Sequence, residues 1–306
     1  MQAISLSGLC ACLLLSVGCV RQPVTGISVD PAFRTLIAPD TKLLSGIEWD
    51  SLKVTPFYQR HEKDLNIPQL GALTERLGVD PTRDISKLVV AWDGRDWLMM
   101  ERGRFNTSDL QKKLITQGAQ TTTYRNHTLI GNNLGAVVFF KNVGLEGSTT
   151  AVDRAIDLEA KGEGEIPEEL QERLRTLSKN DQLWTVSRAG LAFANFATNS
   201  DFQTALSNIT GSVSGTTAGL YVDTGLHLSV DLQCVSDQGA TRVHDALRGI
   251  IGFGRLSTKD NEQDLLRAYD AIKVEKTNQI VQVRADLSAE LADKLIATLM
   301  SLRRNR

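Results

Sequence analysis

Histidine and cysteine, the residues with the widest catalytic and metal-binding chemistry, are scarce in this chain. Its 306 residues include four of each, and the histidines are His61, His127, His227 and His244. They are isolated, and none stands in a metal-ligand spacing such as H-E-x-x-H. The nucleophile elbow G-x-S-x-G and the S-x-x-K pair are also missing from the sequence. These patterns favour a non-enzymatic protein, so we expect no catalytic residue, no metal and no cofactor.

A charged turn flanked by two tryptophans is the best candidate for a contact surface. Asp93, Arg95 and Asp96 stand between Trp92 and Trp97, and an Asp-Gly pair between two apolar runs is typical of a β-hairpin turn. Tryptophan and arginine side chains are enriched at binding hot spots. The alternative is that both tryptophans pack in the core, since each lies at the end of an apolar strand.

The start of the chain has the pattern of a signal peptide. Residues 3–20 read AISLSGLCACLLLSVGCV and contain no charged residue, with a leucine-rich centre followed by small residues. The end, LLLSVGC, resembles the lipobox of bacterial lipoproteins, which implies cleavage before Cys19 and attachment of a diacylglycerol to its sulfur. The alternative is an uncleaved membrane anchor, because about 18 apolar residues in a helix span roughly 27 Å. Both alternatives place the body in the cell envelope, facing the periplasm or the exterior.

The remaining cysteines support no disulfide framework. Cys10 and Cys12 would leave with the signal peptide, and Cys19 would carry the lipid, so Cys234 stands alone in the mature chain. Cys234 ends a strand in which Leu228, Val230 and Leu232 alternate with polar residues. We therefore expect its thiol in the core rather than in a reactive, exposed setting.

The net charge and the length of the chain limit its possible partners and its number of folded units. Lys plus Arg number 34 against 36 for Asp plus Glu, so the formal net charge is -2 and gives no long-range field that would attract a nucleic acid. The length is sufficient for two units, each with its own core. We therefore expect no nucleic-acid partner.

The two units are visible as a repeated pattern. Residues 88–117 contain a hairpin followed by a helix, with strands expected over 85–92 and 97–105, and residues 218–247 repeat that order with a turn at Asp223. The charged, glycine-containing stretch KGEGEI at 161–166 is the best boundary between the units. The predicted organisation lists a signal peptide at 1–18, a tether at 19–39, a first unit at 40–162 and a second at 163–306. The predicted fold class is α+β, with each unit an antiparallel sheet that carries its helices on one face.

Two stretches, GVDPTRDISKLVVAWDGRDWLMMERGRF and LRGIIGFGRLS, resemble a group of uncharacterised bacterial secreted proteins and lipoproteins. The resemblance implies a duplicated α+β unit and a location in the envelope. The group has no established activity, so it implies no site residue.

The sequence therefore predicts a lipid-anchored envelope protein with a binding or structural role. Its expected partners are the membrane, through the lipid, and another envelope protein. Two alternatives remain, both using a crevice between the two units. A hydrolase of envelope polymers would need two carboxylates roughly 5 to 10 Å apart, and a small-ligand carrier would need an apolar cavity of roughly 300 Å³ or more.

Overall fold

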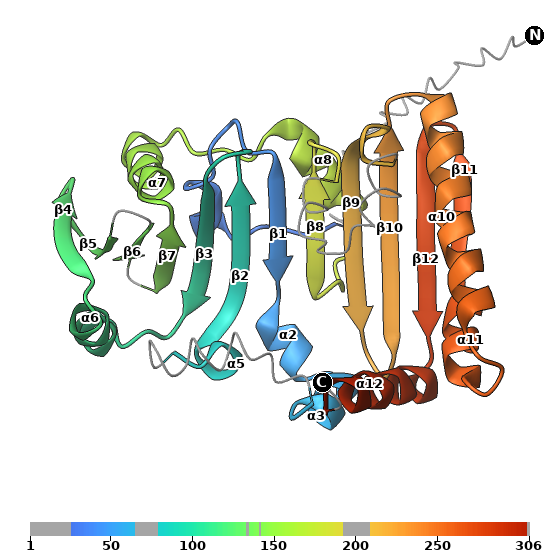
Figure 1. The fold of residues 1–306 in the computed structure, drawn as a ribbon. Helices are drawn as coiled ribbons and strands as arrows, with labels where there is room; N and C mark the ends of the chain where they lie inside the picture. The colour runs from blue at the N-terminus through green and yellow to red at the C-terminus, as the bar shows by residue number, and fades with distance from the viewer. Residues whose placement is uncertain (1–25, 65–78, 133–134, 141, 192–208, 305–306) are drawn as a thin grey trace, which may run out of the picture.

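The computed structural model describes residues 26–64, 79–132, 135–140, 142–191 and 209–304, and this part of the chain forms one large antiparallel sheet with helices packed on it (Figure 1). The sheet has 12 strands in the order β11-β12-β10-β9-β8-β1-β2-β3-β7-β6-β5-β4. The predicted α+β class with antiparallel pairing is confirmed.

The first half of the chain supplies seven of the described strands. They are β1 (Leu43–Ile47), β2 (Ile85–Trp92), β3 (Trp97–Gly103), β4 (Gln120–Tyr124), β5 (His127–Asn132), β6 (Gly135–Phe140) and β7 (Val143–Gly147). Its helices are α1 (Pro31–Arg34), α2 (Trp49–Lys53), α3 (Pro56–His61), α5 (Pro81–Asp84), α6 (Thr107–Thr116) and α7 (Thr149–Lys161). The predicted hairpin is confirmed as β2 and β3, which pair from Trp92 opposite Trp97.

The second half supplies the other five. They are β8 (Leu183–Ser187), β9 (Val213–Val222), β10 (Leu226–Cys234), β11 (Ile272–Thr277) and β12 (Ile280–Leu287). Its helices are α8 (Glu168–Thr176), α10 (Asp237–Ser257), α11 (Gln263–Asp270) and α12 (Ala289–Arg304).

The halves meet at a seam between β1 and β8. These strands pair antiparallel over their full length, from Leu43 opposite Ser187 to Ile47 opposite Leu183. Outward from the seam the strand order is the same in both halves, β1-β2-β3-β7-β6 and β8-β9-β10-β12-β11, and the first half adds β5 and β4. The expectation of a crevice between the halves is wrong, because a backbone ladder occupies that position. Each unit alone would leave an unpaired edge strand here, and the backbone groups of that strand hydrogen-bond to the other unit instead.

Helices lie on both faces of the sheet, not on one face of each unit as predicted. One face carries α1, α7 and α8, whose apolar side chains form a core with Leu44, Val89 and Trp184. The opposite face carries α2, α3 and α6, which pack with Leu88 and Leu183, the residues immediately before Val89 and Trp184 in their strands. Because neighbouring residues of a strand point to opposite faces, the two sets belong to two separate layers. α10 covers the second face farther along, in a third core that contains Leu232 and Cys234.

The chain between residues 26 and 39 belongs to the folded body, so the predicted tether is too long. Phe33 and Ile37 are completely buried, and Ile27 N–H donates to Leu174 O at 2.9 Å. Asp30 caps α1 by accepting from Ala32 N–H, and its carboxylate pairs with Arg102 of β3. The prediction failed because only Phe33 of the five buried apolar residues in this segment lies in the four-residue helix, so the sequence shows no helical period; the other four are Ile27, Val29, Leu36 and Ile37.

None of the helices that the structure describes is long and apolar enough to cross a membrane. The predicted signal peptide and Cys19 lie outside the described residues.

Candidate binding site between α6 and the sheet

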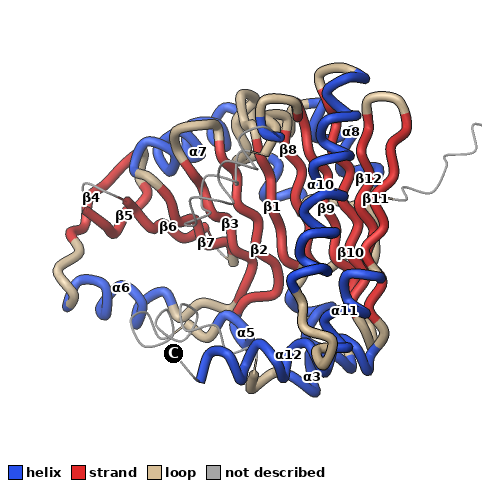
Figure 2. The backbone as a smooth tube through the Cα atoms, turned by 45° about the vertical axis from the view of Figure 1, so that its right-hand side comes forward, coloured by secondary structure: helices blue, strands red, loops and turns tan. Residues whose placement is uncertain are grey.

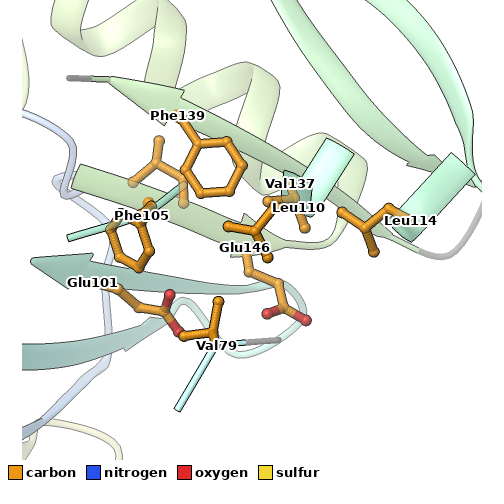
Figure 3. Close-up of a pocket in the computed structure, with 10 residues that line it drawn as sticks. Val79, Glu101, Phe105, Leu110, Leu114, Val137, Phe139 and Glu146 are labelled. Atoms are coloured by element: carbon orange, nitrogen blue, oxygen red, sulfur yellow. The ribbon is translucent and has the colours of Figure 1, made fainter. Parts of the chain in front are cut away.

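Two glutamates from neighbouring strands share one face of the sheet beside α6. Glu101 of β3 lies opposite Gly144 of β7, and Glu146 follows two residues along β7. Such diagonal neighbours have Cβ atoms roughly 7 Å apart and point to the same side. Figure 3 shows both carboxylates directed to the same side of the sheet, near Val79.

The surroundings of this pair are apolar. The pocket around it has a volume of about 20 Å³, enough for one water molecule or a group of similar size. Apart from the two glutamates and Gly144, every lining residue is a hydrocarbon or aromatic side chain: Val79, Phe105, Leu110, Leu114, Val137, Phe139 and Leu145. The Phe105 and Phe139 rings lie 5.6 Å apart between their centroids and form one wall.

Burial raises the pKa of Glu101 to about 7, and the charge of Glu146 adds to the shift. An apolar environment disfavours the ionised carboxylate, and a second negative charge close by disfavours it further. Among the described residues, no ion pair involves Glu101, whereas Glu146 has a further interaction. Glu101 is therefore much more readily protonated near neutral pH than an ordinary glutamate.

Local sequence explains the position of each part. Gly144 lies beside the Glu101 side chain, since a Cβ on residue 144 would be in ordinary van der Waals contact with Glu101 Oε2, at 3.4 Å. Asn106 caps α6 by accepting from Asp109 N–H, which starts the helix immediately after β3. Leu110 is buried one turn later and closes the pocket from above the sheet.

An open groove adjoins the pocket and shares Phe139 with it. The groove has a volume of about 390 Å³ and lies between α6 and the β4–β5 hairpin. Its other lining residues are mostly polar: Thr107, Gln111, Asn126, His127, Thr128 and Ile130. The site is thus a small acidic, apolar pocket at the end of a wider polar groove.

This arrangement has the elements of acid–base chemistry but not the room for a polymer substrate. A carboxyl with a raised pKa beside a second carboxylate is typical of glycosidase sites. A pocket of about 20 Å³ does not admit a sugar ring. The adjoining groove is larger, but its lining is mostly polar, whereas a carrier of drug-sized ligands needs an apolar cavity.

The predicted contact residues at the hairpin turn lie at the other end of β3. Trp97 is 40% exposed, and the Arg95 side chain is almost fully exposed. Asp93 accepts from the backbone N–H groups of Arg95 and Asp96, both at 2.8 Å, which fixes the turn. Burial opposes ionisation of Asp93, but these bonds outweigh it and hold its pKa below the ordinary value. The turn remains a predicted contact surface.

The histidines form no metal site with the acidic and cysteine residues within the described part of the chain. His61 and His227 join aspartates in structural contacts instead. His61 Nε2 lies 2.7 Å from Asp293 Oδ1 of α12, and His227 lies between Asp223 and Asp286. Cys234 is a free, buried thiol, as predicted, and burial raises its pKa.

Sequence reasoning missed Glu101 and Glu146. One signal was available: Glu101 has the same alternation position as Met99 and Trp97 in a strand that is apolar on both faces. A charged residue in the middle of a strand that is otherwise apolar on both faces is unusual and marks a candidate position for a partly buried charge. The partner could not be found, because nothing in the sequence shows that β7 pairs with β3.

Comparison with known proteins gives a likeness of fold only. The chain matches no protein-family model and no curated protein sequence. Crystal form III of TP0453 is similar with a TM-score of 0.51 at 10% sequence identity, covering 90% of this chain and 99% of that chain. Crystal form I has a TM-score of 0.47 at 11% identity with coverage of 90% and 98%, and crystal form IV has 0.47 at 9% with coverage of 89% and 97%. The described fold is therefore similar to that of TP0453 over most of both chains.

Proposed function

We propose that this protein is a lipid-anchored component of the bacterial cell envelope that acts by binding a partner, and that the pocket of Glu101 and Glu146 is the specific part of the binding site. The partner presents a cationic group, such as an ammonium, on an apolar chain. The observation that carries this proposal is a carboxylate pair enclosed by hydrocarbon and aromatic side chains at the end of an open groove.

Charge complementarity selects the cation. The Glu101 carboxylate is partly buried among apolar side chains and forms no ion pair within the described residues, so its ionised form is costly, and an incoming cation offsets that cost. The pocket accepts a group about the size of one water molecule, which suits an ammonium head. Phe105 and Phe139 can cover the methylene groups behind the head, since aromatic faces attract cations and pack well against alkyl chains.

Binding is better supported than hydrolysis. Both roles could use Glu101 and Glu146, but a hydrolase must also enclose the scissile bond of its polymer, and about 20 Å³ is too little space for that. A partner that inserts one side chain needs no more space than the pocket offers.

The location rests on the start of the sequence. A signal-peptide pattern ends at Gly18-Cys19, and the described body begins at Gly26, only seven residues later. A body attached this closely to its lipid would stay near the membrane surface. Labelling of cells with a fatty-acid probe should mark the wild-type protein and not Cys19→Ser. Persistent label in the variant, or an intact leader by mass spectrometry, would favour the uncleaved anchor.

The binding role is tested by site-specific photocrosslinking in intact cells. A photoreactive residue at Gln111, in the groove, should capture an envelope protein, and the same residue at Glu275 on β11 should not. Adding Glu101→Gln should abolish capture from position 111, because the amide cannot neutralise a cation. Capture that is unaffected by Glu101→Gln would refute the pocket as the specific part of the site.

A further inference from the structure

β4 closes the sheet with an edge that carries none of the usual protection against pairing. Its sequence, QTTTY, has no charge and no proline, and Gln120, Thr121, Thr122 and Thr123 are exposed. In Figures 1 and 2 no described element lies beyond it. Natural edge strands are commonly blocked by lysine, proline or a covering segment, because free backbone groups recruit other strands. This edge is therefore suited to receive one.

The opposite edge of the sheet is different. β11 carries Lys273, Glu275 and Lys276, and α10 and α11 pack against it. Pairing of β4 with β11 of another copy would be heterologous, so each added copy would leave a free edge for the next and the assembly would not stop at a defined number of copies. Pairing of β4 with β4 closes after two copies.

The turn after β4 determines which of its backbone groups are free. Arg125 and Asn126 have φ of 42° and 67°, the left-handed pair of a two-residue type I′ hairpin turn. Tyr124 and His127 flank this turn and pair directly, so they form the hydrogen-bonded pair that ends the ladder. Because the pattern alternates, Tyr124 and Thr122 direct their backbone N–H and C=O groups toward β5. Thr121 and Thr123 direct theirs outward.

Only one antiparallel register between two β4 edges uses groups that are all available. A two-fold axis at Thr121 would need Ala119 N–H, which already donates to Leu114 O at 3.0 Å. An axis at Thr123 would need Arg125, whose left-handed backbone cannot continue a strand. With an axis at Thr122, Thr121 of each copy lies opposite Thr123 of the other copy. The outward N–H and C=O groups of Thr121 then form hydrogen bonds with those of the facing Thr123, and the two-fold axis repeats this pair once.

We propose that two copies of this chain associate through their β4 edges, with a two-fold axis at Thr122, and so extend the sheet across both molecules. The side chains at the junction are complementary to themselves, since threonine lies opposite threonine and β-branched pairs of this kind stabilise sheets. The end of the strand is also held in place: Tyr124 Oη donates to Asp157 Oδ1 of α7 at 3.1 Å, and Arg125 forms an ion pair with the same aspartate. The edge is thus preorganised and carries no like-charge repulsion. This proposal does not depend on the binding role of the Glu101 pocket.

Disulfide trapping tests the register. At the axis, the two Thr122 residues form a non-hydrogen-bonded pair with Cα atoms about 4.5 Å apart, within the range of a disulfide. Full-length Thr122→Cys, extracted from membranes and oxidised, should give covalent dimers above the wild-type background. Thr121→Cys is the matched control, because its two copies lie two residues apart along the strands, beyond disulfide reach. Equal trapping by both variants, or none by Thr122→Cys, would overturn the register.

A charge exchange tests the association itself. Sedimentation velocity of the extracted protein should show a dimer for wild type and a monomer for Thr122→Lys and for Thr122→Glu, because like charges would face each other at the axis. Mixing the two variants should restore a dimer, since lysine then faces glutamate. A monomeric wild type at every concentration tested would overturn the proposal and leave the edge for a different protein. A dimer that persists in Thr122→Lys would place the contact elsewhere.

Discussion

Gly46 lies directly opposite Trp184 across the seam that joins the two halves of the sheet. The indole of Trp184 is buried and occupies the space where a side chain at position 46 would stand. The same core contains Leu44 and Val186, the next facing pair on this side of the ladder. The junction of the halves therefore depends on a missing side chain in the first half and a large one in the second.

Gly46→Ala should destabilise the protein by about 2 kcal/mol, because the added methyl group overpacks the seam and displaces Trp184. The control is Gly249→Ala in α10, where a Cβ would meet nothing within 4 Å. That change should leave stability unchanged or raise it by about 1 kcal/mol, since alanine favours helix. Urea unfolding of both variants measures the difference. A Gly46→Ala protein as stable as wild type would show that the seam can repack freely.

Asp30→Asn should lower the free energy of unfolding by about 2 kcal/mol at neutral pH, because it breaks a partly buried pair with Arg102. Burial opposes ionisation of Asp30, but its bonds with Arg102 and Ala32 outweigh this and lower its pKa. The stabilisation is thus present above the ordinary carboxyl pKa and lost as the solution becomes more acid. The difference between wild type and variant should shrink on acidification.

The matched control for that variant is Asp40→Asn. Asp40 also pairs with an arginine, Arg154, but both side chains are at least 40% exposed. Exposed pairs contribute about 0 to 1 kcal/mol, so its loss should be small. If both variants had equal effects, the segment from 26 to 39 would not be anchored as the structure describes.

Glu101→Gln should stabilise the protein in alkaline solution and not in acid. Because the folded-state pKa is raised from 4.5 to about 7, the folded protein binds more protons than the unfolded chain between these values, and stability falls as pH rises through this range. Above pH 7 the loss is on the order of 3 kcal/mol. Thermal unfolding at pH 5 and pH 8 should show that the variant is more stable than wild type at pH 8 but not at pH 5. The control, Glu159→Gln at an exposed position, should be no more stable than wild type at either pH. An identical pH dependence in Glu101→Gln and wild type would contradict the partly buried, apolar setting of this carboxyl.

Local features were the part of the fold that the sequence could predict. The Asp93-Gly94 turn, the limits of β2 and the buried position of Cys234 follow from turn chemistry and two-residue alternation within a few neighbouring residues. The seam could not be found this way, because LLSGI at 43–47 and LWTVS at 183–187 are short strands whose patterns fit many partners. Pairing across 140 residues is decided by the whole core and leaves no mark on either segment.

The candidate site was hidden for the same reason. Glu101 and Glu146 are far apart in sequence and adjacent only because β7 returns beside β3. The β4 edge, by contrast, could have been recognised from QTTTY and the turn that follows, but its position at the end of the sheet required the strand order.

The central claim, that the Glu101 pocket binds a cation on an apolar chain, is tested most directly by titrating the full-length protein with hexylammonium and following its backbone amide signals by NMR. The account predicts saturable shifts around Glu101, Leu110 and Phe139, no shifts with hexanoate, and loss of binding in Glu101→Gln. Below pH 7, the affinity for hexylammonium should increase about tenfold for each unit by which the pH rises, because binding needs the ionised carboxylate. Equal binding of hexanoate, or hexylammonium binding that is unchanged in Glu101→Gln, would contradict the claim.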